Sequence, residues 1–377
     1  MKKFSNSRVL HIIDSLEIGG AEKFLSSLVI EHKSSLTIKV IVIKRMGPIG
    51  KKLSSLGFDV VDLSLSNSLK LPYFLLRFFK EIKSFNPDVV HTWMYHSNFL
   101  GGTVSWLAGF KRIIWSIHNF NIDKGILKPR TRMLIKILSR LSYFIPLKII
   151  YCSKASSNVH IQAGFDKKKT EFIPNGVEIP NKFNYGYKNS REGFLNLPNN
   201  KFIIGMVGRY DIQKNHIGFF ESLKILKNRK FNFHTVIVGR GCDKNNHILD
   251  NFIKSNDLSN FISMYGERHD ISNVLQCLDL FVMPSIGEAF PISLCEAMAN
   301  SVPCIGNDVG DVSYIIGDPS LVIPSWDPEM FADLIIKIGN LSEEHRKALS
   351  ERQYNRVKEN FSIQSVGSKY LQMYMGL

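Results

Sequence analysis

The sequence predicts an α/β protein with two domains, each built on a parallel β-sheet. Two series of short apolar runs rich in β-branched residues alternate with helical segments, and a polar linker separates the two series. Strands and helices alternating at this spacing require crossover connections, which give parallel strands covered by helices on both faces. With 377 residues, 44% of them hydrophobic and 21% charged, the chain is long enough and apolar enough for two globular cores.

The predicted elements follow the periodicity of the apolar residues. Runs of three to nine residues with β-branched side chains are read as strands, and segments with apolar residues three and four apart are read as helices. The helices include 21–33, 72–85 and 130–144. The expected strands are 8–16, 37–44, 59–65, 88–94, 112–118, 148–153 and 171–173 in the first series, and 202–208, 234–239, 261–265, 280–284, 302–306 and 321–324 in the second.

The domain boundaries are expected at the polar linker and near the C-terminus. Residues 175–200 are rich in Asn, Gly, Pro and Lys and separate the two series. We therefore assign 1–180 to an N-terminal domain and 181–355 to a C-terminal domain. The remaining stretch continues a helical pattern that is too long for one more crossover, so 356–377 is expected as a C-terminal helix that can pack back on the N-terminal domain.

Segments that would export the chain or span a membrane are not recognised. The first apolar run is interrupted by His11, Asp14 and Glu17, unlike the core of a signal peptide. No uncharged apolar run reaches the roughly 18 residues that a spanning helix needs. Five scattered cysteines without a Cys-x-x-Cys pair argue against a disulfide framework and a zinc site, and for a reducing compartment. We expect a cytoplasmic protein.

The positive charge is confined to one half of the chain. Residues 1–185 hold 28 Lys and Arg against 12 Asp and Glu, whereas residues 186–377 hold 20 against 21. Such asymmetry indicates binding to nucleic acid or to an anionic membrane surface. A coding bias towards lysine accounts for part of the excess, but not for its confinement to one half. No nucleic-acid-binding motif is recognised, so we favour the membrane.

A basic helix is the predicted contact with that membrane. Arg132, Lys136 and Arg140 follow one another at four-residue steps and so share one helix face. Apolar residues occupy another face and are expected to pack on the sheet. Taken alone, this pattern fits an ordinary surface helix with a solvated basic stripe. Together with the basic N-terminal half, it predicts peripheral docking on the anionic inner face of the plasma membrane. The apolar residues are Leu134, Ile137, Leu138 and Leu141.

Two glycine-containing turns are candidates for phosphate binding. Gly19 and Gly20 follow the first strand and open a helix, where backbone N–H groups can approach a phosphate. Gly239 begins a second such turn after a strand of the second domain. Neither turn completes the three-glycine dinucleotide fingerprint, which weighs against a nicotinamide enzyme. A plain tight turn remains the alternative for a lone pair of glycines.

A basic loop follows the first strand of the second domain. Arg209 and Lys214 are five residues apart and are expected on an exposed loop at the carboxyl end of that strand. Arginine can grip a diphosphate through its planar fork, and lysine can bind it as a point charge. Taken alone, these residues also fit two solvated surface cations.

The segment 285–298 is the most informative part of the chain. A strand ends in a polar loop that carries Glu288, and a helix begins near Pro291 and carries Glu296. The free N–H groups of that helix suit an anion, and the two carboxylates suit sugar hydroxyls. Glu296 lies in an otherwise apolar stretch, where an unpaired carboxylate is costly. We therefore interpret both residues as functional rather than structural.

These motifs together resemble the family-four retaining glycosyltransferases of the GT-B fold. The resemblance extends in order along nearly the whole chain. It implies two Rossmann-like domains facing across a cleft, with the acceptor held by the N-terminal domain and a nucleotide-diphosphate sugar by the C-terminal one. The matching segments are GGAE at 19–22, PDVVHTW at 87–93, SIHN at 116–119, IPNGV at 173–177, VGRYDIQKNH at 207–216, IVGRG at 237–241 and the pair Glu288 and Glu296.

The resemblance also implies roles for individual residues. Arg209 and Lys214 resemble the pair that neutralises the donor diphosphate. Glu288 resembles the residue that binds the transferred sugar, and Glu296 the one that binds the ribose. His118 resembles a histidine near the transferred sugar, although a lone histidine after a strand is more often structural. The main-chain groups of Phe290, Pro291 and Ile292 would contact sugar and phosphate, with Gly19, Gly20 and Gly239 as further donor-binding residues.

The predicted activity is a metal-independent hexosyl transfer with retention of configuration. The chain contains no Asp-x-Asp pair of the kind that often holds a divalent ion on a diphosphate. The donor is expected to be a UDP-sugar and the acceptor a glycan or a polyprenyl-linked lipid in cell-surface polysaccharide biosynthesis. The alternatives are a sugar-nucleotide epimerase of the same fold and a non-catalytic subunit of a glycosylation complex.

Overall fold

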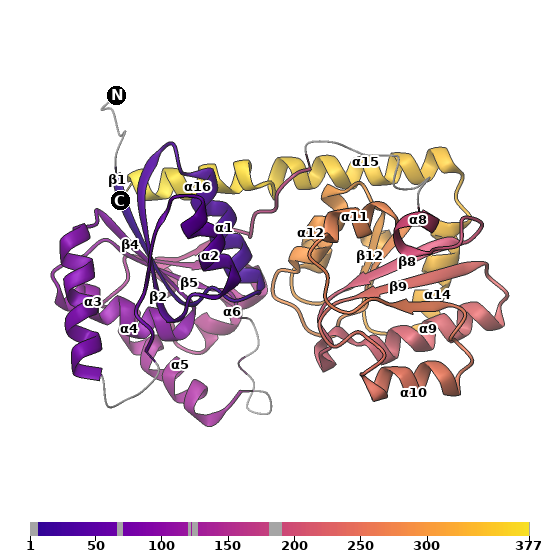
Figure 1. Ribbon diagram of the computed structural model, residues 1–377, viewed down its shortest axis with the longest axis horizontal. Coiled ribbons are helices and arrows are strands. Elements are labelled where there is room, and N and C mark those ends of the chain that lie inside the picture. The colour runs from indigo at the N-terminus through magenta and orange to yellow at the C-terminus, as the bar shows by residue number, and fades with distance from the viewer. Residues whose placement is uncertain (1–6, 66–70, 120–121, 123–126, 181–190, 377) are drawn as a thin grey trace. The chain divides into compact units, whose positions relative to one another are not determined.

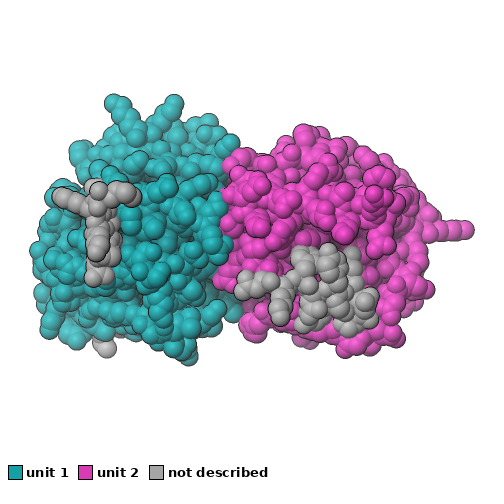
Figure 2. All heavy atoms as spheres, turned by 90° about the horizontal axis from the view of Figure 1, so that it is seen from above, with its two compact units in different colours: residues 1–176, 363–377 teal, residues 177–362 magenta. Residues whose placement is uncertain are grey.

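The chain folds into two compact α/β units, which confirms the predicted fold class. In the computed structural model, residues 7–65, 71–119, 122, 127–180 and 191–376 are described. One unit comprises residues 1–176 and 363–377, and the other residues 177–362 (Figure 2). We call them unit 1 and unit 2. No helix in these described ranges is both long and apolar enough to cross a membrane.

Unit 1 is built on a parallel sheet with the strand order β3-β2-β1-β4-β5-β6-β7 (Figure 1). The central strand β1 pairs in parallel with β2 and β4, so that Ile12 lies beside Ile41 and Thr92. Continuous burial from Val9 to Ile13 is expected for a central parallel strand covered on both faces. The strands are β1 (Ser7–Ser15), β2 (Leu36–Arg45), β3 (Asp59–Asp62), β4 (Val89–Trp93), β5 (Ile113–Ile117), β6 (Lys148–Tyr151) and β7 (Thr170–Phe172).

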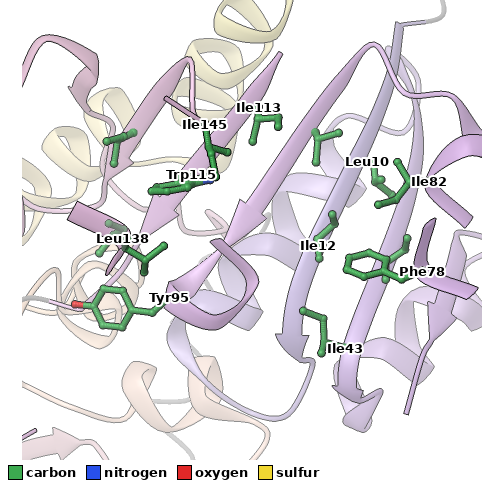
Figure 3. Close-up of a cluster of buried hydrophobic side chains, with 14 of the residues drawn as sticks. Leu10, Ile12, Ile43, Phe78, Ile82, Tyr95, Ile113, Trp115, Leu138 and Ile145 are labelled. Carbon is green, nitrogen blue, oxygen red and sulfur yellow. The ribbon is translucent and has the colours of Figure 1, made fainter. Parts of the chain in front are cut away.

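Three helices cover one face of this sheet. Phe78 and Ile82 of α3 and Leu138 of α5 join Ile12 and Trp115 of the sheet in one apolar cluster (Figure 3). The helix α4 contacts both α3 and α5 and so lies between them. The helices of unit 1 are α1 (Gly20–Glu31), α2 (Gly47–Ser55), α3 (Leu71–Phe85), α4 (Met94–Leu107), α5 (Pro129–Leu141), α6 (Lys154–Gln162) and α16 (Ile363–Gly376).

The side that α5 turns to the core differs from the predicted one. Ile137 is exposed and shares the outer side with Lys136 and Arg140, whereas Arg132 is half-buried. The prediction that Ile137 packs inward is therefore wrong, and Arg132 is only partly exposed. The small Ser139 is also buried, close to Gly164. The core-facing residues are Ile135, Leu138 and Ser139, with Leu134 and Leu141 at the edge of the same cluster, as expected.

Unit 2 repeats the architecture with the strand order β10-β9-β8-β11-β12-β13. The adjacent strands β8 and β11 pair in parallel, so their carboxyl ends meet at one edge of the sheet. The strands are β8 (Phe202–Val207), β9 (Phe233–Val238), β10 (Ile262–Met264), β11 (Leu280–Met283), β12 (Cys304–Asn307) and β13 (Val322–Ile323). The helices are α8 (Arg191–Leu195), α9 (His216–Asn228), α10 (His247–Ser255), α11 (Ile271–Gln276), α12 (Ile292–Ala299), α13 (Val312–Ile316), α14 (Pro328–Gly339) and α15 (Glu343–Asn360).

The C-terminal segment consists of two helices that belong to different units. The predicted boundary between 355 and 356 falls inside α15, which continues to Asn360. The break comes at Phe361 and Ser362, where the Phe361 carbonyl accepts a hydrogen bond from the Val177 N–H. The helix α16 then contacts α1 of unit 1 (Figure 1). The Tyr374 hydroxyl lies 2.7 Å from Nδ1 of His91, which ties α16 to β4.

Candidate functional site

The loop after β8 is shaped by its own polar residues. A short 3-10 turn, Ile212–Lys214, begins at Asp211, whose carboxylate accepts a hydrogen bond from the Gln213 N–H at 3.0 Å. Asn215 takes the left-handed conformation (φ 57°) that reverses the chain into α9. Asparagine is one of the few residues that adopts this conformation readily. The turn thus fixes the position of Lys214, two residues before α9 begins at His216.

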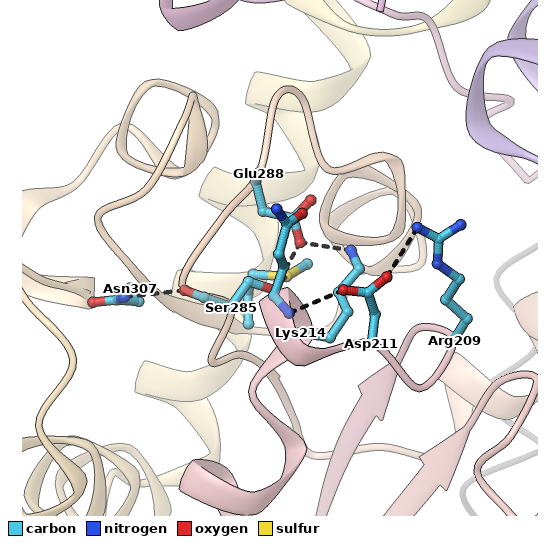
Figure 4. A network of polar contacts seen from close by, with 8 residues as sticks. Arg209, Asp211, Lys214, Ser285, Glu288 and Asn307 are labelled. Carbon is cyan, nitrogen blue, oxygen red and sulfur yellow. Dashed lines mark hydrogen bonds and ion pairs between the residues drawn. The ribbon is translucent and has the colours of Figure 1, made fainter. Parts of the chain in front are cut away.

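A buried ion pair joins this loop to the loop after β11. Nζ of Lys214 lies 2.6 Å from Oε1 of Glu288, and the hydroxyl of Ser285 donates to the same oxygen at 2.7 Å (Figure 4). The side chain of Glu288 is 9% exposed and that of Lys214 is 22% exposed. The structure therefore brings together two residues that the sequence singled out. The expectation that Lys214 stands on an exposed loop is wrong, because Glu288 draws it inward.

Arg209 lies at the outer end of the same network. Its guanidinium donates to Asp211 at 3.1 Å, and its side chain is 61% exposed. An exposed pair of this kind is weak and exchanges easily with another anion. Each of the two cations is thus held by a carboxylate, Arg209 by Asp211 and Lys214 by Glu288. A diphosphate could replace these carboxylates as the partner of both cations.

Two buried polar residues of this network were not singled out from the sequence. Ser285 is fully buried, and its carbonyl oxygen accepts a hydrogen bond from the side-chain amide of Asn307 at 3.0 Å. Asn307 ends β12, the strand next to β11. Serine and asparagine are common in loops, so their types alone gave no signal. Their positions at the carboxyl ends of adjacent strands were the available clue, because ligand sites of parallel sheets lie at such ends.

Gly239 acts on the same loop by allowing close backbone approach. A Cβ at this position would lie 2.0 Å from the Gly208 carbonyl oxygen and 2.9 Å from the Arg209 nitrogen. Only glycine therefore lets the end of β9 pass this close to the basic loop. The Gly208 N–H bonds to the Val238 carbonyl at 2.9 Å. The structure assigns Gly239 a supporting position beneath Arg209, while direct contact with a donor stays a prediction.

Behind the basic loop lies a neutral histidine. His216 opens α9, and its Nε2 lies 3.3 Å from Sγ of Cys242. Burial, together with the charge of Lys214, lowers the pKa of His216 to about 4. Burial raises the pKa of Cys242 to about 12. Both groups are therefore uncharged near neutral pH. The charges of the site come from the two ion pairs, Arg209 with Asp211 and Lys214 with Glu288.

The helix α12 presents its N-terminus beside Glu288. Pro291 is its N-cap and Ile292 its first residue, and no side chain caps its free N–H groups. Such N–H groups suit a phosphate or a sugar oxygen. Phe290 is buried, with its ring 5.5 Å from that of Phe361. Glu296 lies in the same helix and is half-buried.

His118 lies in unit 1, directly after β5. Its ring stacks on Trp93, with centroids 5.3 Å apart and planes 19° apart. Burial lowers the pKa of His118 to about 4, so the ring is neutral near pH 7. Both ring nitrogens are buried, and the side chain of Asn175 is the polar group that lies against the ring.

Gly19 and Gly20 also lie in unit 1, at the start of α1. The carboxylate of Glu22 lies over this turn, since a Cβ on Gly19 would come 2.2 Å from Oε2. Glu22 is the third residue of the helix, a position from which glutamate often caps the helix start. Burial raises the pKa of Glu22. A phosphate could reach these N–H groups only if the Glu22 side chain turned away.

No metal centre is formed by the described residues. Among them, no group of three or more His, Cys, Asp or Glu side chains is arranged to hold an ion. None of the five cysteines is in a disulfide, and all five are buried.

Comparison with known proteins identifies two families that together cover most of the chain. Residues 18–179 match Glycosyltransferase Family 4, and residues 188–356 match Glycosyl transferases group 1. The first match lies in the half with the seven-stranded sheet, and the second spans the basic loop and the segment from Glu288 to Glu296.

Individual relatives are bacterial glycosyltransferases. The chain is 26% identical over 323 residues to an Escherichia coli UDP-Gal:alpha-D-GlcNAc-diphosphoundecaprenol alpha-1,3-galactosyltransferase, covering 84% of this chain and 81% of the relative. It is 25% identical to the capsular polysaccharide biosynthesis glycosyltransferase CapH of Staphylococcus aureus, covering 97% and 98%. The crystal structure of Anabaena HepE in complex with UDP superimposes with a TM-score of 0.84 at 17% identity, covering 98% and 100%. The chain therefore belongs to the family-four glycosyltransferases and has the GT-B fold.

Proposed function

We propose that this enzyme transfers a hexose from a UDP-sugar to a glycan or polyprenyl-linked acceptor in cell-surface polysaccharide biosynthesis, with retention of anomeric configuration. The Escherichia coli relative uses, by its name, a UDP-sugar and a diphosphoundecaprenol-linked acceptor, and the Staphylococcus aureus relative acts in capsule biosynthesis. In this proposal unit 2 binds the donor and unit 1 the acceptor. The observation that carries it is the network of Arg209, Lys214 and Glu288 at the carboxyl ends of β8 and β11.

The donor diphosphate replaces the carboxylates that hold the two cations. Arg209 leaves the exposed pair with Asp211 and grips the diphosphate through its fork. Before the donor binds, Lys214 is held by Glu288, whose carboxylate also accepts the Ser285 hydroxyl. Lys214 then exchanges this carboxylate for the diphosphate and adds its charge from the inner side. The uncapped N–H groups at the start of α12 add further donors. Preorganised groups of this kind stabilise the negative charge that develops on the departing UDP.

Release of Lys214 to the diphosphate leaves Glu288 free to bind the sugar. Oε1 of Glu288 still accepts the Ser285 hydroxyl, so its second oxygen can accept hydrogen bonds from hydroxyls of the transferred hexose. We assign Glu296, half-buried in α12, to the ribose hydroxyls of the nucleotide. In this proposal Glu288 binds the transferred sugar, and Glu296 binds the ribose of the nucleotide.

Retention requires the acceptor to attack the face that the UDP leaves. The leaving-group oxygen takes the proton of the acceptor, and Arg209 and Lys214 hold that oxygen in place. We propose that the neutral ring of His118, which lies beside Asn175, accepts a hydrogen bond from the sugar or donates one to it. The cations perform the charge neutralisation that a divalent ion supplies in other transferases, so we expect transfer without added metal.

The site of action is the cytoplasmic face of the plasma membrane, where a polyprenyl-linked acceptor would be embedded. Unit 1 carries most of the positive charge and would be attracted to anionic lipids.

Product analysis tests the proposal. The enzyme is incubated with a panel of UDP-sugars and a short-chain polyprenyl-diphosphate sugar in detergent, and the product linkage is read by NMR. We expect a new glycosidic bond with the anomeric configuration of the donor. An altered nucleotide sugar formed without acceptor would identify an epimerase. No product with any donor, together with no binding of UDP, would indicate a non-catalytic subunit and refute the proposal.

A further inference from the structure

The outer surface of α3, α4 and α5 differs from the rest of the molecule. These three helices cover one face of the unit 1 sheet, as the shared apolar cluster on their inner sides shows. Their outer sides therefore form one continuous surface, which we call the α3–α5 face (Figure 1). We include in it the turn between α5 and β6, residues 142–147.

The α3–α5 face concentrates exposed apolar side chains. The described residues include sixteen large apolar side chains that are exposed, and ten of them lie on this face. Isolated exposed apolar residues are normal on any protein, but a patch of this kind marks an interaction surface. The most exposed are Phe144 at 74%, Tyr73 and Leu76 at 71%, Leu107 at 70% and Met133 at 66%. The others are Phe79, Phe99, Ile137, Tyr143 and Leu147.

Basic side chains alternate with the apolar ones along both outer helices. On α5 the side chains of Met133, Lys136, Ile137 and Arg140 are exposed. They are spaced three and four residues apart and therefore lie on one side of the helix. The outer side of α3 repeats this mixture. Its exposed apolar and basic residues include Tyr73, Leu76, Arg77, Phe79, Lys80 and Lys83, and Pro72 and Ser84 are exposed as well.

Acidic residues are nearly missing from these helices. In the described sequence of α3, α4 and α5 the only carboxylate is that of Glu81, which lies 2.8 Å from Nζ of Lys39 and is thereby neutralised. A protein partner would usually be met with charges of both signs. An uninterrupted mixture of cations and exposed apolar groups instead fits a surface that is anionic outside and apolar beneath, as an acidic phospholipid bilayer is.

We propose that the α3–α5 face lies in the interface of an anionic phospholipid bilayer, with its apolar side chains inserted below the headgroups. This inference rests on the proposed membrane-embedded acceptor. The basic residues attract the face to the lipid phosphates. Leu76, Met133 and Phe144 then enter the boundary between headgroups and acyl chains, which makes binding partly resistant to salt. Docking by charge alone would be abolished at high ionic strength.

Sedimentation with vesicles separates the two contributions. Wild type should bind vesicles of phosphatidylglycerol and phosphatidylcholine strongly at low salt, and a fraction should stay bound at about 1 M salt, where charge interactions are screened. Replacing Leu76, Met133 and Phe144 with Gln should remove the salt-resistant fraction and weaken low-salt binding by about tenfold or more, as expected for lost apolar burial. Replacing Ile248 and Met330, exposed apolar residues of unit 2, with Gln is the matched control and should have no effect.

A single reporter measures insertion directly. The five native cysteines are buried, so a cysteine introduced as Phe144→Cys can be labelled selectively with a polarity-sensitive dye. Its emission should shift to the blue with anionic vesicles, whereas the same dye on Ile248→Cys should not respond.

The outcomes distinguish this inference from the proposed function. Equal binding of the Gln variant and wild type at both salt concentrations, with an unresponsive dye on Phe144→Cys, would overturn insertion and leave docking by charge. Binding to native membranes but not to protein-free vesicles would also overturn it, in favour of a membrane protein as the partner. Sugar transfer to the acceptor in detergent needs no bilayer and tests the proposed function independently.

Discussion

Removal of Lys214 should destabilise unit 2, and removal of Glu288 in addition should restore much of the lost stability. In Lys214→Ala, the Glu288 carboxylate, with a side chain 9% exposed, loses its counterion and keeps the Ser285 hydroxyl at 2.7 Å. Glu288→Gln removes the charge that needs a partner. The double variant should therefore be more stable than Lys214→Ala alone, although it lacks one more native group.

The size of the effect follows from the burial of the pair. Removing one partner of a fully buried ion pair costs about 3–5 kcal/mol. Because Lys214 is 22% exposed and Ser285 still satisfies Glu288 in part, we expect about 1–3 kcal/mol for Lys214→Ala. For a unit of this size that corresponds to roughly 3–9 °C in Tm. Glu288→Gln alone should cost less than about 1 kcal/mol, because a partly exposed ammonium can turn to solvent.

Thermal and urea unfolding of the four proteins in the cycle measure this coupling. Lys224→Ala, at an exposed lysine of α9, is the matched control and should leave Tm unchanged. Transfer activity should not follow the same pattern as stability. Lys214→Ala, Glu288→Gln and the double variant should each lose about 10²–10³-fold in kcat. The reasoning is refuted if Lys214→Ala is as stable as wild type, if the two stability losses simply add, or if the double variant recovers activity.

Four further outcomes are expected. Arg209→Lys keeps the charge but loses the fork, so UDP affinity should fall by about tenfold without a change in Tm; calorimetry showing unchanged affinity would contradict it. Glu296→Gln should weaken UDP binding and Glu288→Gln should spare it, whereas identical titrations would invalidate the assigned roles. Transfer should survive excess chelator, and loss of activity restored by magnesium or manganese would argue for a metal. Stability should fall on acidification: burial lowers the folded-state pKa of His11 to about 3 and of His118 to about 4, below the ordinary 6.5. Their contribution is therefore complete above pH 6.5 and is lost as the pH falls from about 6.5 to 4 for His118 and to 3 for His11; a Tm constant from pH 6.5 to 4 would be inconsistent with neutral buried rings.

Features carried by contiguous residues were predictable from the sequence. Alternation of apolar strands and helices is a local pattern, and it led correctly to two parallel sheets. The order of short motifs such as VGRYDIQKNH led to the glycosyltransferase family, which the comparisons confirm. Glu288 and Lys214 were each identified because each lies on the loop that follows a strand, where parallel sheets place their ligands.

Helix orientation and the exact ends of elements were less predictable. The pattern of α5 allowed two sides to face the sheet, and the outward position of Ile137 became known only with the packing of Leu138 and Ser139. The boundary expected at residue 355 lies within α15, because the helix ends only where Phe361 bonds to Val177. A helical repeat indicates that a helix forms, whereas long-range contacts decide how far it continues and which side it buries.

The sequence by itself determined the class of fold, the family and the chemical types available at the site. Only the tertiary structure decided that Lys214 meets Glu288, 74 residues away, and that Ser285 and Asn307 support them. It also decided that apolar and basic residues of separate helices share the α3–α5 face. The physical reason is that periodicity and motif spacing depend only on residues that are close together in the sequence. Ion pairs between loops and surfaces shared by helices depend instead on strand order and packing, which bring distant residues together.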